Sequence, residues 1–147
     1  MISRRLVCLF SFVVFSVAPS FAHHMALVVN KGNSVADVSS VHLAKIFRLE
    51  VRKWHSGEDI VLVLHANSET ERTTVERLCG RSGPELKALL AAHSDAIKLV
   101  DTDADVLKFV ESNPGAVGLV DVRSITDQIN VVKVDKKLPM EAGYLPH

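Results

Sequence analysis

Hydrophobic residues in this chain gather in short runs that alternate with stretches of helical periodicity. Residues 26–30 and 60–64 are apolar runs of strand length, and the second, Ile-Val-Leu-Val-Leu, is the strongest strand signal in the sequence. A continuous run, as opposed to an alternating one, is typical of a strand that is covered on both faces. Weaker runs at 97–100, 116–120 and 130–134 predict three further strands.

Between these runs, apolar residues recur three and four positions apart, which predicts helices with one apolar face. Ser39 or Ser40, the Ser68–Glu71 spacing, Pro84 and the Thr102–Asp105 spacing mark the helix starts. The positions expected to face inward are Leu43, Ile46, Phe47, Val75, Leu78, Cys79, Leu86, Leu89, Leu90, Val106, Phe109 and Val110. Strands alternating with helices indicate right-handed crossovers and an α/β fold, with a mixed or mostly parallel sheet covered by helices.

Residues 1–22 have the three parts of a secretory signal peptide. Arg4 and Arg5 form a basic region, residues 6–17 an apolar stretch, and Ser20-Phe21-Ala22 a cleavage site with small residues. The apolar stretch is shorter than the roughly 20 residues that span a bilayer. We therefore expect cleavage after Ala22, no membrane insertion, a periplasmic or secreted location, and one domain over residues 23–147.

Composition narrows the classes of partner. The chain has 17 basic and 17 acidic residues, and removal of Arg4 and Arg5 leaves 15 against 17. Without an excess of basic charge, we expect no nucleic acid as a partner. Cys79 is the single cysteine outside the signal, so we expect no internal disulfide. Residues 136–147 lose the periodicity of the preceding segments and are expected to form a loosely ordered tail.

Three segments resemble the periplasmic phosphate-binding proteins of ABC importers, in the order that this family has them. They are Val28-Val29-Asn30-Lys31; Ile46-Phe47 with Trp54, Gly57 and the strand from Ile60; and Asn113-Pro114-Gly115-Ala116-Val117-Gly118. The resemblance covers most of residues 26–122 and implies a solute-binding-like fold with the length of one lobe, similar to the second lobe of that family. Leu49 and Leu119 stand where the family has Gly and Tyr.

The same resemblance points to the loop after the central strand as an anion site. The family holds phosphate with an Arg at this strand end and a Ser-Gly-Thr at the next helix. Here His65 stands near the Arg position, and Glu69 replaces the Gly. Free N–H groups at a helix start favour an anion. The candidate ligands are the His65 ring when protonated, the Asn67 amide, the Ser68 and Thr70 hydroxyls, and Arg72.

The alternative for this loop is an ordinary helix cap. Ser68 and Glu71 can satisfy the free N–H groups themselves, and the charges of Glu69 and Glu71 disfavour a bound anion.

Other residues with suggestive chemistry are better explained by structure. We expect Trp54 to cover the sheet edge, and Gly115 and Gly118 to lie at a turn and a close strand approach. Cys79 with His65 or His93 could form a thiol nucleophile, but its apolar helical face favours an inert core residue. The mature terminus His23-His24 is either a copper chelator or a solvated pair. We expect no catalytic residue, metal or cofactor.

The first functional interpretation is therefore a periplasmic solute-binding-like protein for phosphate or a related oxyanion. Its expected partners are membrane transporter subunits, or a homodimer that supplies the other wall of the site. The alternative is a non-enzymatic accessory, interaction or sensor module of the cell envelope that kept the scaffold and lost the ligand. An enzyme would require an exposed Cys79 with a depressed pKa.

Overall fold

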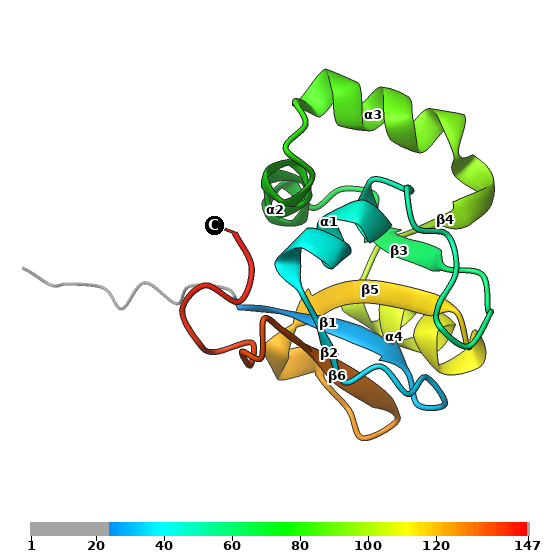
Figure 1. Cartoon of the computed structure of the whole chain (residues 1–147), viewed down its shortest axis with the longest axis vertical. Helices are drawn as coiled ribbons and strands as arrows, with labels where there is room; N and C mark the ends of the chain where they lie inside the picture. The colour runs from blue at the N-terminus through cyan, green and yellow to red at the C-terminus, as the bar shows by residue number, and fades with distance from the viewer. Residues whose placement is uncertain (1–23, 147) are drawn as a thin grey trace, which may run out of the picture.

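The computed structural model describes residues 24–146, and within them the strands form one mixed sheet in the order β2-β6-β1-β5-β3-β4 (Figure 1). The strands are β1 (Met25–Asn30), β2 (Asp37–Val38), β3 (Val61–His65), β4 (Ile97–Val100), β5 (Ala116–Asp121) and β6 (Ile129–Val134). β3 runs parallel to β4 and β5, and β2 runs parallel to β6. β1 runs antiparallel to both of its neighbours, β5 and β6. The predicted mixed α/β sheet is confirmed.

The helices begin at the polar residues that the sequence offers as caps. They are α1 (Ser40–Phe47), α2 (Glu69–Cys79), α3 (Gly83–Ala92) and α4 (Asp103–Ser112), with short 3-10 turns η1 (Ser94–Ala96) and η2 (Val122–Ser124). Side-chain oxygens of Ser39, Ser68, Ser82 and Thr102 each accept a hydrogen bond from an N–H in the first turn that follows. Such a bond satisfies one of the N–H groups that a helix start leaves without a partner.

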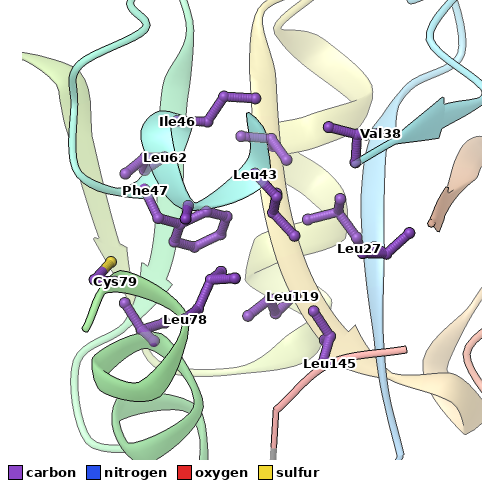
Figure 2. Packing of buried hydrophobic residues seen from close by; sticks show 14 of the residues in the cluster. Leu27, Val38, Leu43, Ile46, Phe47, Leu62, Leu78, Cys79, Leu119 and Leu145 are labelled. Carbon is purple, nitrogen blue, oxygen red and sulfur yellow. The ribbon is translucent and has the colours of Figure 1, made fainter. Parts of the chain in front are cut away.

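Side chains from successive strand residues enter two different cores, one on each face of the sheet. Leu27 and Val29 face α1 and α2, whereas Val28 faces α4. Figure 2 shows the first core, in which the Phe47 ring lies among Leu43, Leu78 and Leu119. Cys79 belongs to this core and is buried, as predicted.

Two glycines, one directly before β5 and one within it, allow close approaches, and the single tryptophan covers the start of this strand. The indole Nε1 of Trp54 donates to the Gly115 carbonyl at 3.0 Å, and the ring packs against the first core. A Cβ on Gly115 would lie 1.9 Å from the Asp59 carbonyl oxygen, and one on Gly118 would lie 2.7 Å from Val106 on α4. The expected positions of Gly115 at a turn and of Gly118 at a close approach are confirmed. Trp54 was expected at the sheet edge, but it covers the start of β5, which lies inside the sheet.

The last described residues return to the middle of the sheet. Tyr144 and Leu145 are buried, and the Tyr144 hydroxyl accepts from the Leu27 N–H at 3.0 Å and donates to the Val132 carbonyl. The loose order expected for residues 136–147 concerns motion and stays a prediction. What the sequence did not indicate is that Tyr144 joins β1 to β6.

The predicted signal peptide, residues 1–22, lies outside the described residues, as does His23. Among residues 24–146, no helix is long and apolar enough to cross a bilayer.

Candidate functional site

The candidate site lies at the carboxyl end of β3, where the connections between strands change from one face of the sheet to the other. After β3, α2 packs into the core on one face; after β4, α4 packs into the core on the opposite face. Ligands of open α/β sheets bind at such a switch point, outside the carboxyl ends of the strands. His65 is the last residue of β3, and the first turns of α2 and α4 lie beside it.

The His65 ring bridges the two helices. Its Nδ1 lies 2.9 Å from Glu71 Oε1 on α2, and its Nε2 lies 2.8 Å from Asp103 Oδ1 on α4. The exposed fraction of the side chain is 12% for His65, 4% for Glu71 and 27% for Asp103. The hydrogen bond that the Glu71 carboxylate accepts from the ring is the main cause that raises the pKa of His65 above 6.5; burial opposes this rise, and the Asp103 carboxylate adds to it. His65 was expected to be an anion ligand, but both of its ring nitrogens already have partners within the protein.

Glu71 takes a different role from the one its position in the capping pattern indicates. Ser68 does cap the helix, because its hydroxyl accepts from the Glu71 N–H at 3.2 Å. The Glu71 carboxylate, however, turns away from the Ser68 N–H and accepts from the His65 backbone N–H at 2.7 Å. Only half of the predicted capping box is therefore formed, and the buried carboxylate is paired with histidine.

Asp103 joins the site from a distant part of the sequence. Its Oδ2 accepts from the Asp121 N–H at 3.0 Å and from the Ser124 hydroxyl at 2.7 Å. The sequence indicated only a helix start in this segment, and Asp103 was not predicted as a site residue. The available signal was an acidic residue in the first turn of a helix after a strand that neighbours β3.

The other predicted ligands lie in the loop and first turn of α2. Asn67 and Thr70 are exposed, and Ser68 lies between them at the cap. Among the described residues, no acceptor lies within hydrogen-bond distance of the N–H groups of Asn67, Glu69 and Thr70. Arg72 is exposed and lies along the helix, with Nη2 at 3.5 Å from Glu69 and Nε at 3.9 Å from Glu76. The structure thus brings together Asn67, Ser68 and Thr70, with Arg72 one turn away.

Thr70 also faces the end of the chain. Together with Thr74 and His24 it lines a 30 Å³ cavity that Pro139, Tyr144 and Leu145 close. This volume suits about one water molecule. The tail therefore forms a wall next to the first turn of α2.

Two chemistries that the sequence left open have little structural support. Burial raises the pKa of the Cys79 thiol to about 11, which disfavours the thiolate that a nucleophile needs. The Nδ1 of His93 contacts the Leu89 carbonyl on α3 at 3.0 Å. In the described part of the chain, no group of three or more His, Cys, Asp or Glu side chains could hold a metal ion. Copper binding at His23-His24 stays a hypothesis.

Comparison with solved structures finds several chains with the same fold. The chain superposes on an ABC-type phosphate transport receptor from Vibrio cholerae with a TM-score of 0.64 and 19% identity over 80% of this chain. A putative phosphate ABC transporter substrate-binding protein from Clostridium perfringens, solved with bound phosphate, matches 79% of the chain with a TM-score of 0.65 and 23% identity. PstS from Borrelia burgdorferi matches 80% of the chain with a TM-score of 0.60 and 16% identity.

The chain has the fold of these substrate-binding proteins. It spans about half their length, with 48%, 46% and 49% of each protein covered. The resemblance seen in the sequence is thus confirmed for the fold. No protein-family model and no curated protein matches the sequence.

Proposed function

We propose that this protein is a non-catalytic solute-binding protein of the cell envelope that binds phosphate or a related oxyanion at the first turn of α2. Asn67, Ser68, Thr70 and Arg72 contribute the ligand contacts. His65 contributes indirectly, through Glu71. Membrane subunits of an ABC-type importer, or a second copy of the chain, supply the wall that faces this turn.

The observation that carries the proposal is the set of free N–H groups at the start of α2, at the carboxyl end of β3. Asn67, Glu69 and Thr70 present N–H groups that have no acceptor among the described residues. The positive end of the helix dipole lies at the same place and favours a negative ligand. The solved proteins of this fold include one with bound phosphate, which supports an anion as the ligand.

The two glutamates of this turn weaken the site less than the sequence alone indicates. Glu71 is buried and directed at the His65 ring, which offsets the charge of Glu71 when the ring is protonated. Glu69 is 86% exposed and lies 3.5 Å from Arg72, so water and the guanidinium screen it. An anion above the turn therefore meets N–H groups and hydroxyls before it meets either carboxylate.

Calorimetric titration of the purified protein with phosphate and then with sulfate tests this proposal. We expect saturable binding that Ser68→Ala and Arg72→Ala each weaken, Arg72→Ala by about tenfold or more, since a hydrogen bond to a charged group contributes about 1.5–3 kcal/mol. Ser82→Ala and Arg77→Ala are the matched controls. Ser82 caps α3 in the same way, and Arg77 is exposed at the far end of α2.

Absence of heat and of thermal stabilisation up to millimolar phosphate and sulfate would refute the anion site. Equal weakening by the control variants would also refute it, because a general loss of stability then explains the effect.

A second candidate function is an interaction module without a small ligand. The observation in its favour is Leu99, which is 60% exposed on β4, a strand that pairs only with β3 among the described residues. An edge strand with an exposed large apolar residue offers a pairing surface to another chain. If no anion binds, sedimentation of the protein and of Leu99→Lys tests this role: dissociation of a complex by the variant supports it, and an unchanged monomer rejects it.

A further inference from the structure

At the carboxyl ends of the strands, called here the carboxyl edge, one feature needs no ligand. A histidine connects two helices that lie on opposite faces of the sheet. α2 and α4 pack into separate cores and lie on different sides of β3. Their first turns are joined through Glu71, the His65 ring and Asp103, with ring-to-carboxylate distances of 2.9 and 2.8 Å.

This arrangement requires a particular protonation state. An ionised carboxylate can only accept hydrogen bonds, so each ring nitrogen must donate one. Only the positively charged imidazolium has an N–H on both nitrogens. A neutral ring would place a nitrogen lone pair against one of the two carboxylates, and that contact would become repulsive.

The two carboxylates are not held equally at this edge. Glu71 is 4% exposed, and its second oxygen accepts from the His65 backbone N–H at 2.7 Å. Its carboxylate therefore stays beside His65 in both protonation states of the ring. Asp103 is 27% exposed and its second oxygen is held by Asp121 and Ser124, so water can replace the ring as partner of the first. Losing the proton from Nε2 therefore costs less than losing it from Nδ1.

We propose that His65 is a proton-dependent clamp between α2 and α4. The charged ring holds both helices, and loss of the Nε2 proton releases the Asp103 side chain while Glu71 keeps its bonds. Beyond the clamp, Asp121 on β5 and Arg123 on η2 pair with each other at 2.9 Å, and Glu69 lies 3.5 Å from Arg72 on α2. Release changes the charge of the three clamp residues from one negative to two, so the carboxyl edge becomes more negative as the pH rises.

The direction of the pH dependence follows from the raised pKa of His65. A histidine that is easier to protonate in the folded state stabilises the fold fully below its unfolded pKa of about 6.5. That contribution is lost as the pH rises through the folded pKa. The clamp is therefore closed below pH 6.5 and opens as the pH rises through the raised pKa of His65.

Nitrogen-15 NMR of the histidine rings in the whole protein, from pH 5.5 to 9, tests the clamp directly, with His65→Gln to assign the signals. We expect His65 to titrate with a midpoint above 6.5 and to keep its proton on Nδ1 in the neutral form. A neutral form protonated on Nε2, or a midpoint at or below 6.5, would overturn the proposal.

The variant Asp103→Asn separates the clamp from simple packing, because it keeps the shape and removes the charge. We expect a lower His65 midpoint and a smaller difference between the urea midpoints of unfolding at pH 6 and pH 8.5. Asp105→Asn, at the exposed acid two residues along α4, should leave both unchanged. If Asp103→Asn does not fold, the NMR measurement on the natural protein still tests the clamp, because it shows which ring nitrogen of neutral His65 carries the proton. None of these readouts depends on whether an anion binds.

Discussion

Gly115 shows how closely two backbone segments approach when one of them carries no side chain. A Cβ at this position would meet the Asp59 carbonyl oxygen at 1.9 Å. That oxygen belongs to the backbone just before β3, so it cannot move aside as a flexible side chain would. The same Gly115 carbonyl accepts the Trp54 indole N–H. The glycine thus fixes the distance between β3, β5 and the Trp54 turn.

We expect Gly115→Ala to lower the free energy of unfolding by about 1–3 kcal/mol or more, because the added methyl group forces the backbone apart. Gly83→Ala is the control, since its Cβ would lie 3.0 Å from Oε1 of Glu76, the end of a flexible side chain. This control should change the free energy of unfolding by about 0.5 kcal/mol or less. Urea denaturation measures both variants, and similar losses in the two would contradict the explanation.

Individual residues could be predicted from the sequence where their role depends on near neighbours. Ser68 and Cys79 have roles set by helical spacing, and Gly115 by the turn that surrounds it. Asp103 and Tyr144 could not be predicted, because their partners are far along the chain. The contact of Asp103 with His65 spans 38 residues, and that of Tyr144 with Leu27 spans 117. No local pattern encodes such pairs.

Among the helices, α3 is the one least anchored to the sheet. Three of its leucines were expected to face inward, but only Leu86 is fully buried, while Leu89 and Leu90 are partly buried. By contrast, α4 buries Val106, Leu107 and Val110. Figure 1 shows α3 at the outer side of α2, away from the strands. Fewer buried apolar contacts mean a lower free energy of local opening.

We therefore expect backbone amides of α3 to exchange with deuterium faster than those of α4, although the two helices are equally long. Hydrogen exchange followed by mass spectrometry at a single pH measures this difference. The comparison is matched, because both helices have a side-chain cap and ten residues. Equal protection in α3 and α4 would show that α3 is held by contacts that its burial does not explain.

The sequence located nearly every strand and helix, but not how the strands are ordered. Periodicity and caps are local, so they indicate where an element begins and which face is apolar. Strand direction depends on pairing with distant segments, and the antiparallel position of β1 between β5 and β6 left no local signal. The two-residue strand β2 (Asp37–Val38) is too short to show any period.

The two cores share the strands that separate them, so neither can be lost without the other. Leu27 and Val28 are adjacent in β1 and point to opposite faces. The same holds for Leu62 and Val63 in β3. This construction predicts that the described domain unfolds as one cooperative unit.

Ile46→Val on α1 and Val106→Ala on α4 both remove buried methyl groups. We expect each variant to lower the free energy of unfolding by about 0.5–3 kcal/mol and to unfold in a single transition. Fluorescence of Trp54, the single tryptophan, follows the α1 face, and circular dichroism follows all elements. The two signals should give the same urea midpoint in each variant. Separate midpoints in Val106→Ala would show that the α4 face unfolds independently.

The place of β1 in the sheet also sets the order in which the chain can fold during its synthesis. β1 is made before both of its neighbours, β5 and β6, and the Leu27 N–H can reach the Tyr144 hydroxyl only after 117 further residues have been made. Because chains are synthesised from the N-terminus, the centre of the sheet cannot close before β5, β6 and Tyr144 have left the ribosome. During that interval β1 has no strand to pair with on either side, so an apolar segment with free backbone hydrogen-bonding groups stays exposed while residues 31–115 are made.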